Sequence, residues 1–191
     1  MKYRIESSQR ILDDIFKVDE SQVSFERFDG SMSGPVRCLR FVRGDSAAAI
    51  VFHRNWRQII LVQQFRYPAA GWMIEATAGT LRPDEPPESG VRREVEEETG
   101  YRVDRLVPIA TFYVSPGGST ERVFLFYAEV GGADPAVDHG GIAAEHEDIR
   151  VVRIPLAEAR TLLATGGIVD AKTIIALQWL LGSPTRPEVT E

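Results

Sequence analysis

One acidic helix constrains this chain more than any other feature of its sequence. Proline is tolerated in the first turn of a helix and glycine is common just past its end, so Pro86-Pro87 and Gly100 predict a helix over residues 86–99. Residues 84–98 carry seven acidic and two basic side chains, a net charge of −5. Nearly all of the chain's net charge of −6 therefore lies in this short segment.

Three of these carboxylates share one face of the predicted helix. Glu94, Glu97 and Glu98 are spaced i, i+3 and i+4, which makes them neighbours on the helix surface. Like charges at this spacing destabilise a helix, and here they lie in the last turn, where the helix dipole is already negative. Two explanations are open: a solvated acidic face, which the spacing alone favours, or a site for a divalent cation such as Mg²⁺, which prefers oxygen ligands.

The rest of the chain predicts a mixture of strands and helices. Alternating or apolar-rich stretches indicate strands at residues 11–18, 23–28, 36–43, 102–113, 121–130 and 149–154. Two apolar runs, 47–52 and 58–64, predict a buried hairpin, and residues 29–35 and 115–119 predict turns. Helices are expected at 156–164 and 170–181, and residues 131–147 form a long polar loop.

Composition excludes several classes of protein. Hydrophobic residues make up 43% of the 191 residues and charged residues 26%, which suits a globular core and excludes a disordered or coiled-coil chain. The net negative charge argues against a general binder of nucleic acid or of acidic membranes, and no apolar run could span a bilayer. Cys38 is the only cysteine and no secretory signal is evident, so we expect a cytoplasmic protein.

The acidic helix belongs to a longer spaced pattern. It reads Gly79-x5-Glu85-x7-Arg93-Glu94-Val95-x-Glu97-Glu98-x-Gly100-Tyr101. This pattern resembles the Nudix box of the Nudix hydrolase family at every fixed position, and only Tyr101 stands where a smaller aliphatic residue is more usual. Nine spaced positions rarely coincide by chance, so the resemblance favours the cation site over the solvated face.

The resemblance implies a fold, a reaction and a set of ligands. The fold is α+β, an α/β/α sandwich around a mixed sheet with a small β-rich N-terminal segment. The reaction is hydrolysis of a diphosphate, with metals polarising the phosphate and activating water. The implied ligands of Mg²⁺, or of Mn²⁺ in its place, are the carboxylates of Glu94, Glu97 and Glu98 and the main-chain carbonyl of Ala78. We also expect Arg93 to pair with Glu85 and Val95 to face the core.

Residues outside the box resemble the ADP-ribose pyrophosphatase branch of this family and its GDP-mannose-cleaving relatives. Pro116 and Gly117 stand where this branch has its marker, although alone they would indicate a plain turn. The resemblance of residues 62–66 implies that Arg66 contacts a substrate phosphate. That of residues 74–79 implies that Glu75 contacts the nucleotide or the terminal sugar.

For several further residues the sequence leaves two or more roles open. By resemblance, Glu145 is the proton acceptor and Glu147 is a metal ligand, but the two roles could be exchanged. Alternatively, both residues are solvated loop acids without a role in the reaction. In that case Glu97 is the next candidate for the base. Phe28 stands where this branch stacks the base on an N-terminal aromatic, or it is a core residue. Arg37 could hold substrate phosphates or be surface charge.

These expectations combine into one functional prediction. Residues 1–44 are expected to form an N-terminal β-rich dimerisation segment, as in the swapped dimers of this branch, residues 45–183 the Nudix domain and residues 184–191 a flexible tail. The predicted activity is Mg²⁺-dependent hydrolysis of a nucleoside diphosphate sugar, with ADP-ribose giving AMP and ribose 5-phosphate. GDP-mannose is the nearest alternative substrate. The alternative of another class is a non-catalytic, regulatory Nudix module that binds a nucleotide sugar.

Overall fold

The computed structural model describes residues 1–133, 135, 139–141 and 148–182. It divides into two compact units, residues 1–45 with 112–122, and residues 46–111 with the chain from residue 123 onward. The structure thus joins the 112–122 segment to the N-terminal strands. That the first unit serves dimerisation stays a prediction.

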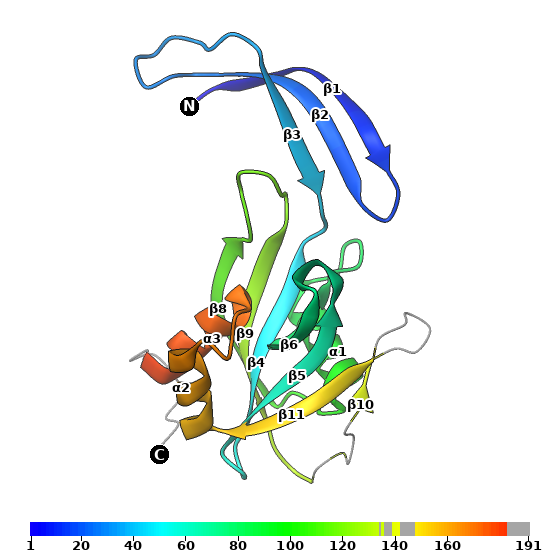
Figure 1. Ribbon diagram of the computed structural model, residues 1–191, viewed down its shortest axis with the longest axis vertical. Helices are drawn as coiled ribbons and strands as arrows, with labels where there is room; N and C mark the ends of the chain where they lie inside the picture. The colour runs from blue at the N-terminus through cyan, green and yellow to red at the C-terminus, as the bar shows by residue number, and fades with distance from the viewer. Residues whose placement is uncertain (134, 136–138, 142–147, 183–191) are drawn as a thin grey trace. The chain divides into compact units, whose positions relative to one another are not determined.

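The first unit contains a three-stranded antiparallel sheet, β1 (Tyr3–Asp13), β2 (Lys17–Phe25) and β3 (Val36–Val42), in that order. The strand predicted over residues 11–18 is wrong, because a turn interrupts it (Figure 1). Leu12 and Val18 face each other across the hairpin, and the Asp14 side chain accepts a hydrogen bond from the Ile15 N–H (2.7 Å) in the turn. The apolar-rich run is therefore two strand ends paired with each other.

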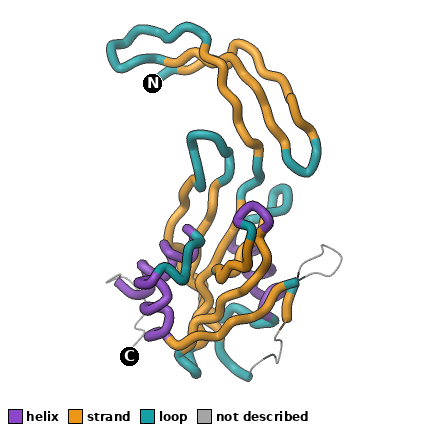
Figure 2. Tube along the Cα trace, in the orientation of Figure 1, coloured by secondary structure: helices purple, strands orange, loops and turns teal. Residues whose placement is uncertain are grey.

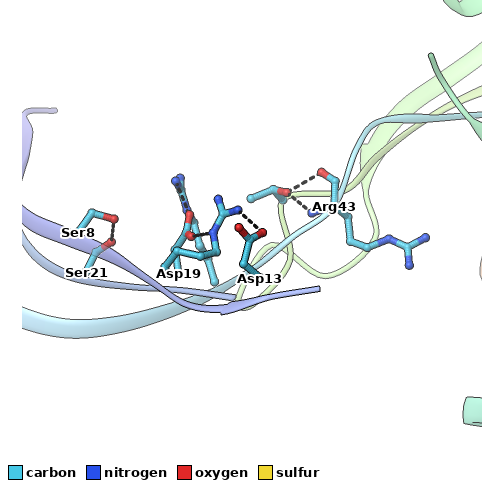
Figure 3. A network of polar contacts seen from close by, with 8 residues as sticks. Ser8, Asp13, Asp19, Ser21 and Arg43 are labelled. Carbon is cyan, nitrogen blue, oxygen red and sulfur yellow. Dashed lines mark hydrogen bonds and ion pairs between the residues drawn. The ribbon is translucent and has the colours of Figure 1, made fainter. Parts of the chain in front are cut away.

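Ion pairs between charged side chains link the three strands of this sheet. The Asp19 carboxylate, which is buried, accepts hydrogen bonds from Arg10 on β1 and from Nε and Nη2 of Arg40 on β3 (3.0 and 2.9 Å) (Figure 3). The Arg10 hydrogen bond is the main cause that lowers the pKa of Asp19. Beyond β3, Arg43 and Thr120 exchange two hydrogen bonds, which attach the 114–121 loop to the strand end (Figure 3).

The second unit contains most of a mixed sheet in the order β10-β11-β5-β4-β9-β8. Its strands are β4 (Ser46–His53), β5 (Gln58–Arg66), β6 (Gly71–Glu75), β7 (Thr77–Thr80), β8 (Arg105–Tyr113), β9 (Arg122–Val130), β10 (His139–Gly140) and β11 (Ile149–Pro155). β4 runs parallel to β9 and antiparallel to β5, which confirms the predicted hairpin.

Helices cover both faces of this sheet, and all of them belong to the second unit (Figure 2). They are α1 (Pro87–Thr99), α2 (Leu156–Thr165) and α3 (Ala171–Gly182), and a short 3₁₀ turn covers Tyr67–Ala69. On one face, Val91 and Val95 of α1 pack with alternate residues of β4 and β9; on the other, Tyr127 of β9 contacts Trp179 of α3 at 5.8 Å between ring centroids. The expected α/β/α sandwich is confirmed, as is the core position of Val95.

The sheet splits between its two central strands. β4 and β5 pair only beside their turn, from Val51 opposite Ile60 to His53 opposite Gln58. Farther along, β6 pairs with β5 and β7 pairs with β4, so the junction of β6 with β7 lies where β4 and β5 no longer pair with each other. Glu75 and Thr77 are both buried there. Within the described residues, none of the helices has the length and apolar character needed to cross a lipid bilayer.

Candidate active site

Helix α1 carries the three predicted carboxylates. It begins at Pro87 and ends at Thr99, and Gly100 adopts the left-handed conformation (φ 72°) with its N–H bonded to the Glu96 carbonyl at 2.9 Å. Because Val91 and Val95 face the core, the helix is fixed in rotation against the sheet. The predicted helix is confirmed at both ends.

Arg93 clamps the loop before the helix to the helix itself. Its Nε and Nη2 donate to the two carboxylate oxygens of Glu85 (3.0 Å each), and Glu85 also accepts from the Arg82 backbone N–H at 2.9 Å. The Arg93 hydrogen bonds are the first cause that lowers the pKa of Glu85 to about 2. The expected pair of Arg93 with Glu85 is confirmed.

Arg93 also contacts two of the predicted metal ligands. Its Nη1 lies 2.7 Å from Oε1 of Glu94 and 2.8 Å from Oε2 of Glu97. A positive charge of the chain itself therefore offsets the repulsion between these carboxylates, and the repulsion alone does not require a cation. Among the described residues, no three acidic, histidine or cysteine side chains are arranged as a ready-made cation cage.

Glu94 lies against the backbone of β7. A β-carbon on Gly79 would overlap its carboxylate, so the glycine makes room for this side chain. Ala78, the predicted carbonyl ligand, is the neighbour of Gly79 in the same strand. Glu98 is buried, with 3% of its surface exposed. The structure thus brings α1 and β7 together as the resemblance implied, while the role of their oxygens as metal ligands stays a prediction.

Arg66 and Glu75 form a second cluster at the split in the sheet. Nε and Nη2 of Arg66 donate to the two oxygens of Glu75 (2.9 and 3.0 Å), and Nζ of Lys172 donates to the same carboxylate at 2.7 Å. Burial raises the pKa of Glu75, but the hydrogen bonds and charges of Arg66 and Lys172 outweigh it and the net pKa is lowered. The two residues predicted to contact substrate are therefore partners of each other.

Sequence reasoning missed Lys172 and its second partner, Asp170. Lys172 also donates to Asp170 at 2.9 Å, and Asp170 accepts from the Thr173 backbone N–H at 3.0 Å, which caps α3. A lysine in the first turn of a helix is unfavourable toward the helix dipole. This unfavourable position was the one local indication in the sequence that Lys172 pairs with a carboxylate from another part of the fold.

The two clusters influence each other electrostatically. The pKa of Arg66 is raised, first by the Glu75 hydrogen bond against an opposing effect of burial, and also by the negative charges of Glu98 and Asp170. The negative charge of Glu98 on α1 is therefore part of the electrostatic environment of Arg66 on β5. The site combines carboxylates on α1 with an anchored guanidinium on β5.

Gly140, Gly141 and the buried ring of Tyr101 pack around the C-terminal end of α1. The Gly141 N–H donates to the Glu97 carbonyl at 3.3 Å, and a β-carbon on Gly140 would overlap the Glu98 backbone. Tyr101, the one departure from the box, is buried with its ring edge-on to His53 at 5.6 Å. The larger residue therefore fills a packed position beside the end of the helix.

Other predicted site residues belong to the first unit. Arg37 donates to Glu20 (2.8 Å from Nε), and Pro116 and Gly117 lie in the predicted loop. Phe28 is fully exposed in a turn, so its alternative as a core residue is wrong. Glu145 and Glu147 lie outside the described residues.

Comparison with known proteins agrees with this geometry. Residues 42–177 match the NUDIX domain. GDP-mannose pyrophosphatase of Yersinia pestis (strain Pestoides F) is 36% identical over 170 residues, covering 86% of this chain and 84% of that protein. GDP-mannose pyrophosphatase of Cronobacter sakazakii is 42% identical over 144 residues, 72% of this chain and 74% of that protein. A crystal structure of an ADP compounds hydrolase shares the fold, with a TM-score of 0.70 and 18% identity over 96% of this chain and 97% of that one. The chain therefore belongs to the Nudix family of pyrophosphohydrolases.

Proposed function

We propose that this enzyme hydrolyses the diphosphate of a nucleoside diphosphate sugar with the aid of Mg²⁺. The observation that carries the proposal is the set of Glu94, Glu97 and Glu98 on one helix, with Glu94 seated against Gly79 of β7. In the reaction, a water oxygen bonds to one phosphorus and the bond from that phosphorus to the bridging oxygen breaks. The products are a nucleoside monophosphate and a sugar phosphate.

The residues of the site fit a hard divalent cation. Carboxylates and the backbone of Ala78 offer oxygen donors, which Mg²⁺ and Mn²⁺ prefer. When bound, the cation supplies polarisation of the phosphate and a more acidic water. Arg93 and Glu85 hold the loop against the helix, and Arg66, anchored by Glu75 with 41% of its side chain exposed, is the group we expect to bind a phosphate.

GDP-mannose is the substrate that the relatives favour. Two proteins named GDP-mannose pyrophosphatase are 36% and 42% identical to this chain over most of its length. We therefore place GDP-mannose, giving GMP and mannose 1-phosphate, before ADP-ribose. ADP-ribose remains the second candidate, because Pro116 and Gly117 resemble a marker that the ADP-ribose pyrophosphatase branch shares with its GDP-mannose-cleaving relatives.

A coupled assay distinguishes the candidates. Each nucleotide sugar is incubated with the protein and Mg²⁺ in the presence of alkaline phosphatase, which releases inorganic phosphate only after the diphosphate has been cleaved. We expect release from GDP-mannose at a higher kcat/KM than from ADP-ribose. No release from any nucleotide sugar, together with calorimetric binding of one, would support the non-catalytic module instead.

The proton acceptor is proposed from the sequence alone. We expect E145Q to lower kcat far more than it raises KM, as for a group that acts in the transition state. E147Q should instead weaken Mg²⁺ binding, so that a higher Mg²⁺ concentration is needed to reach half of the maximal rate. The reverse pattern would exchange the two roles, and mild effects of both would leave Glu97 as the candidate base.

We also propose a homodimer built through the first unit. β1 is exposed along its whole length, and apolar side chains of the sheet and its hairpin are about half exposed, among them Ile5, Leu12, Phe16 and Leu39. A small sheet with little core of its own is marginal in water. Light scattering at micromolar concentration should give twice the 21.3 kDa of one chain. A fully active monomer would contradict this proposal.

A further inference from the structure

Glu97 lies between two arginines that are held in different ways. Its Oε2 lies 2.8 Å from Nη1 of Arg93, and its Oε1 lies 3.6 Å from Nη2 of Arg82. Arg93 is also bonded to Glu85 through its other two nitrogens, and only 19% of its side chain is exposed. Arg93 is thus fixed, whereas the contact of Arg82 is a single longer ion pair.

The backbone of Arg82 is fixed although its side chain is not. The Arg82 N–H donates to Oε2 of Glu85 at 2.9 Å, and the Glu85 N–H donates to the Arg82 carbonyl at 3.0 Å. These bonds close a turn in which Asp84 has a positive φ of 60°. The turn presents the Arg82 side chain toward α1, and 63% of that side chain is exposed. It can therefore leave Glu97 without disturbing the turn.

We propose that Arg82 is a built-in competitor of the divalent cation for Glu97. In the metal-free protein its guanidinium neutralises Oε1 of Glu97; a cation that binds Glu97 displaces it. The inference rests on the proposed role of Glu97 as a metal ligand. Because Arg82 is replaced by the incoming cation, it lowers the affinity of the site for metal.

Metal binding in the absence of substrate tests this inference. Mn²⁺ is titrated calorimetrically into metal-free wild-type protein and into R82Q, R82K and R102Q. Exposed ion pairs contribute little, so R82Q should bind Mn²⁺ about two- to fivefold more tightly than wild type. R82K keeps the charge and should stay close to wild type. R102Q is the matched control, because Arg102 is exposed and pairs with Glu96 (3.2 Å), outside the predicted ligand set.

Thermal unfolding gives a second readout. A ligand that binds only the folded state stabilises it more when its affinity is higher, so the rise in Tm on adding Mn²⁺ should be larger for R82Q than for wild type. Equal Mn²⁺ affinity in R82Q and R102Q would overturn this inference alone. So would an R82K variant that binds Mn²⁺ as tightly as R82Q does. No Mn²⁺ binding by wild type and R82Q alike would overturn both the inference and the proposed function.

Discussion

Glu94 occupies the space that a side chain at position 79 would need: a β-carbon on Gly79 would overlap the Glu94 carboxylate. The overlapping atoms are the far end of a flexible side chain, so the carboxylate can move away while the fold is kept. Gly79 therefore positions Glu94 more than it stabilises the sheet.

Replacing Gly79 by alanine should separate activity from stability. We expect the free energy of unfolding of G79A to lie within about 1 kcal/mol of that of wild type. Its kcat should fall about a hundredfold, because a displacement of about an ångström is enough to misplace a catalytic group. Denaturant unfolding and the coupled phosphate assay measure the two effects. G182A is the control, since a β-carbon there meets open space; wild-type activity in G79A would show that the position of Glu94 is not critical.

The pair of Arg93 with Glu85 predicts a dependence of stability on pH. The folded state lowers the pKa of Glu85 from 4.5 to about 2, so the stabilisation is fully present above the unfolded pKa and is lost as the pH falls through the folded one. The difference in free energy of unfolding between wild type and E85Q should be constant from pH 7 to pH 5 and then shrink toward pH 2. Urea unfolding at several pH values measures it. A difference that does not change with pH would contradict the ion pair.

Lys172 should matter for stability as well as for the site. K172M removes one of two cations from the buried Glu75 carboxylate, and leaving a buried acceptor short of a donor costs about 1–3 kcal/mol. Chemical denaturation measures the loss. K17M, which removes an exposed lysine, should change the free energy of unfolding by no more than about 0.5 kcal/mol. Equal stability of K172M and wild type would mean that Arg66 alone satisfies Glu75.

Local signals in the sequence predicted the helix and the hairpin well. Pro86-Pro87 and Gly100 fixed the ends of α1, and two apolar runs identified β4 and β5. β6 and β7 were missed because they are short, five and four residues, and gain their pairing only where the sheet splits. That split is a tertiary feature with no local pattern.

The sequence predicted which residues make up the site better than it predicted how their side chains pair with one another. Spacing on a helix placed the three glutamates, but the neutralising contacts of Arg93 depend on side-chain geometry that a spacing rule does not contain. Arg66 and Glu75 were each expected to face substrate, and their mutual pair arises because β5 and β6 lie side by side. Lys172 reaches Glu75 from a helix 97 residues away in the chain, which no local pattern could show.

The carboxylates of α1 are proposed to support metal-dependent cleavage of a diphosphate. The most direct test is ³¹P NMR of GDP-mannose incubated with wild type or E98Q, with Mg²⁺ or with EDTA. Wild type with Mg²⁺ should replace the two diphosphate signals by two monoester signals, and EDTA should abolish the change. E98Q, folded as wild type by circular dichroism, should be more than about a hundredfold slower, because losing a ligand costs more than losing its outer-shell partner. Cleavage that persists in EDTA, or at the wild-type rate in E98Q, would contradict the account.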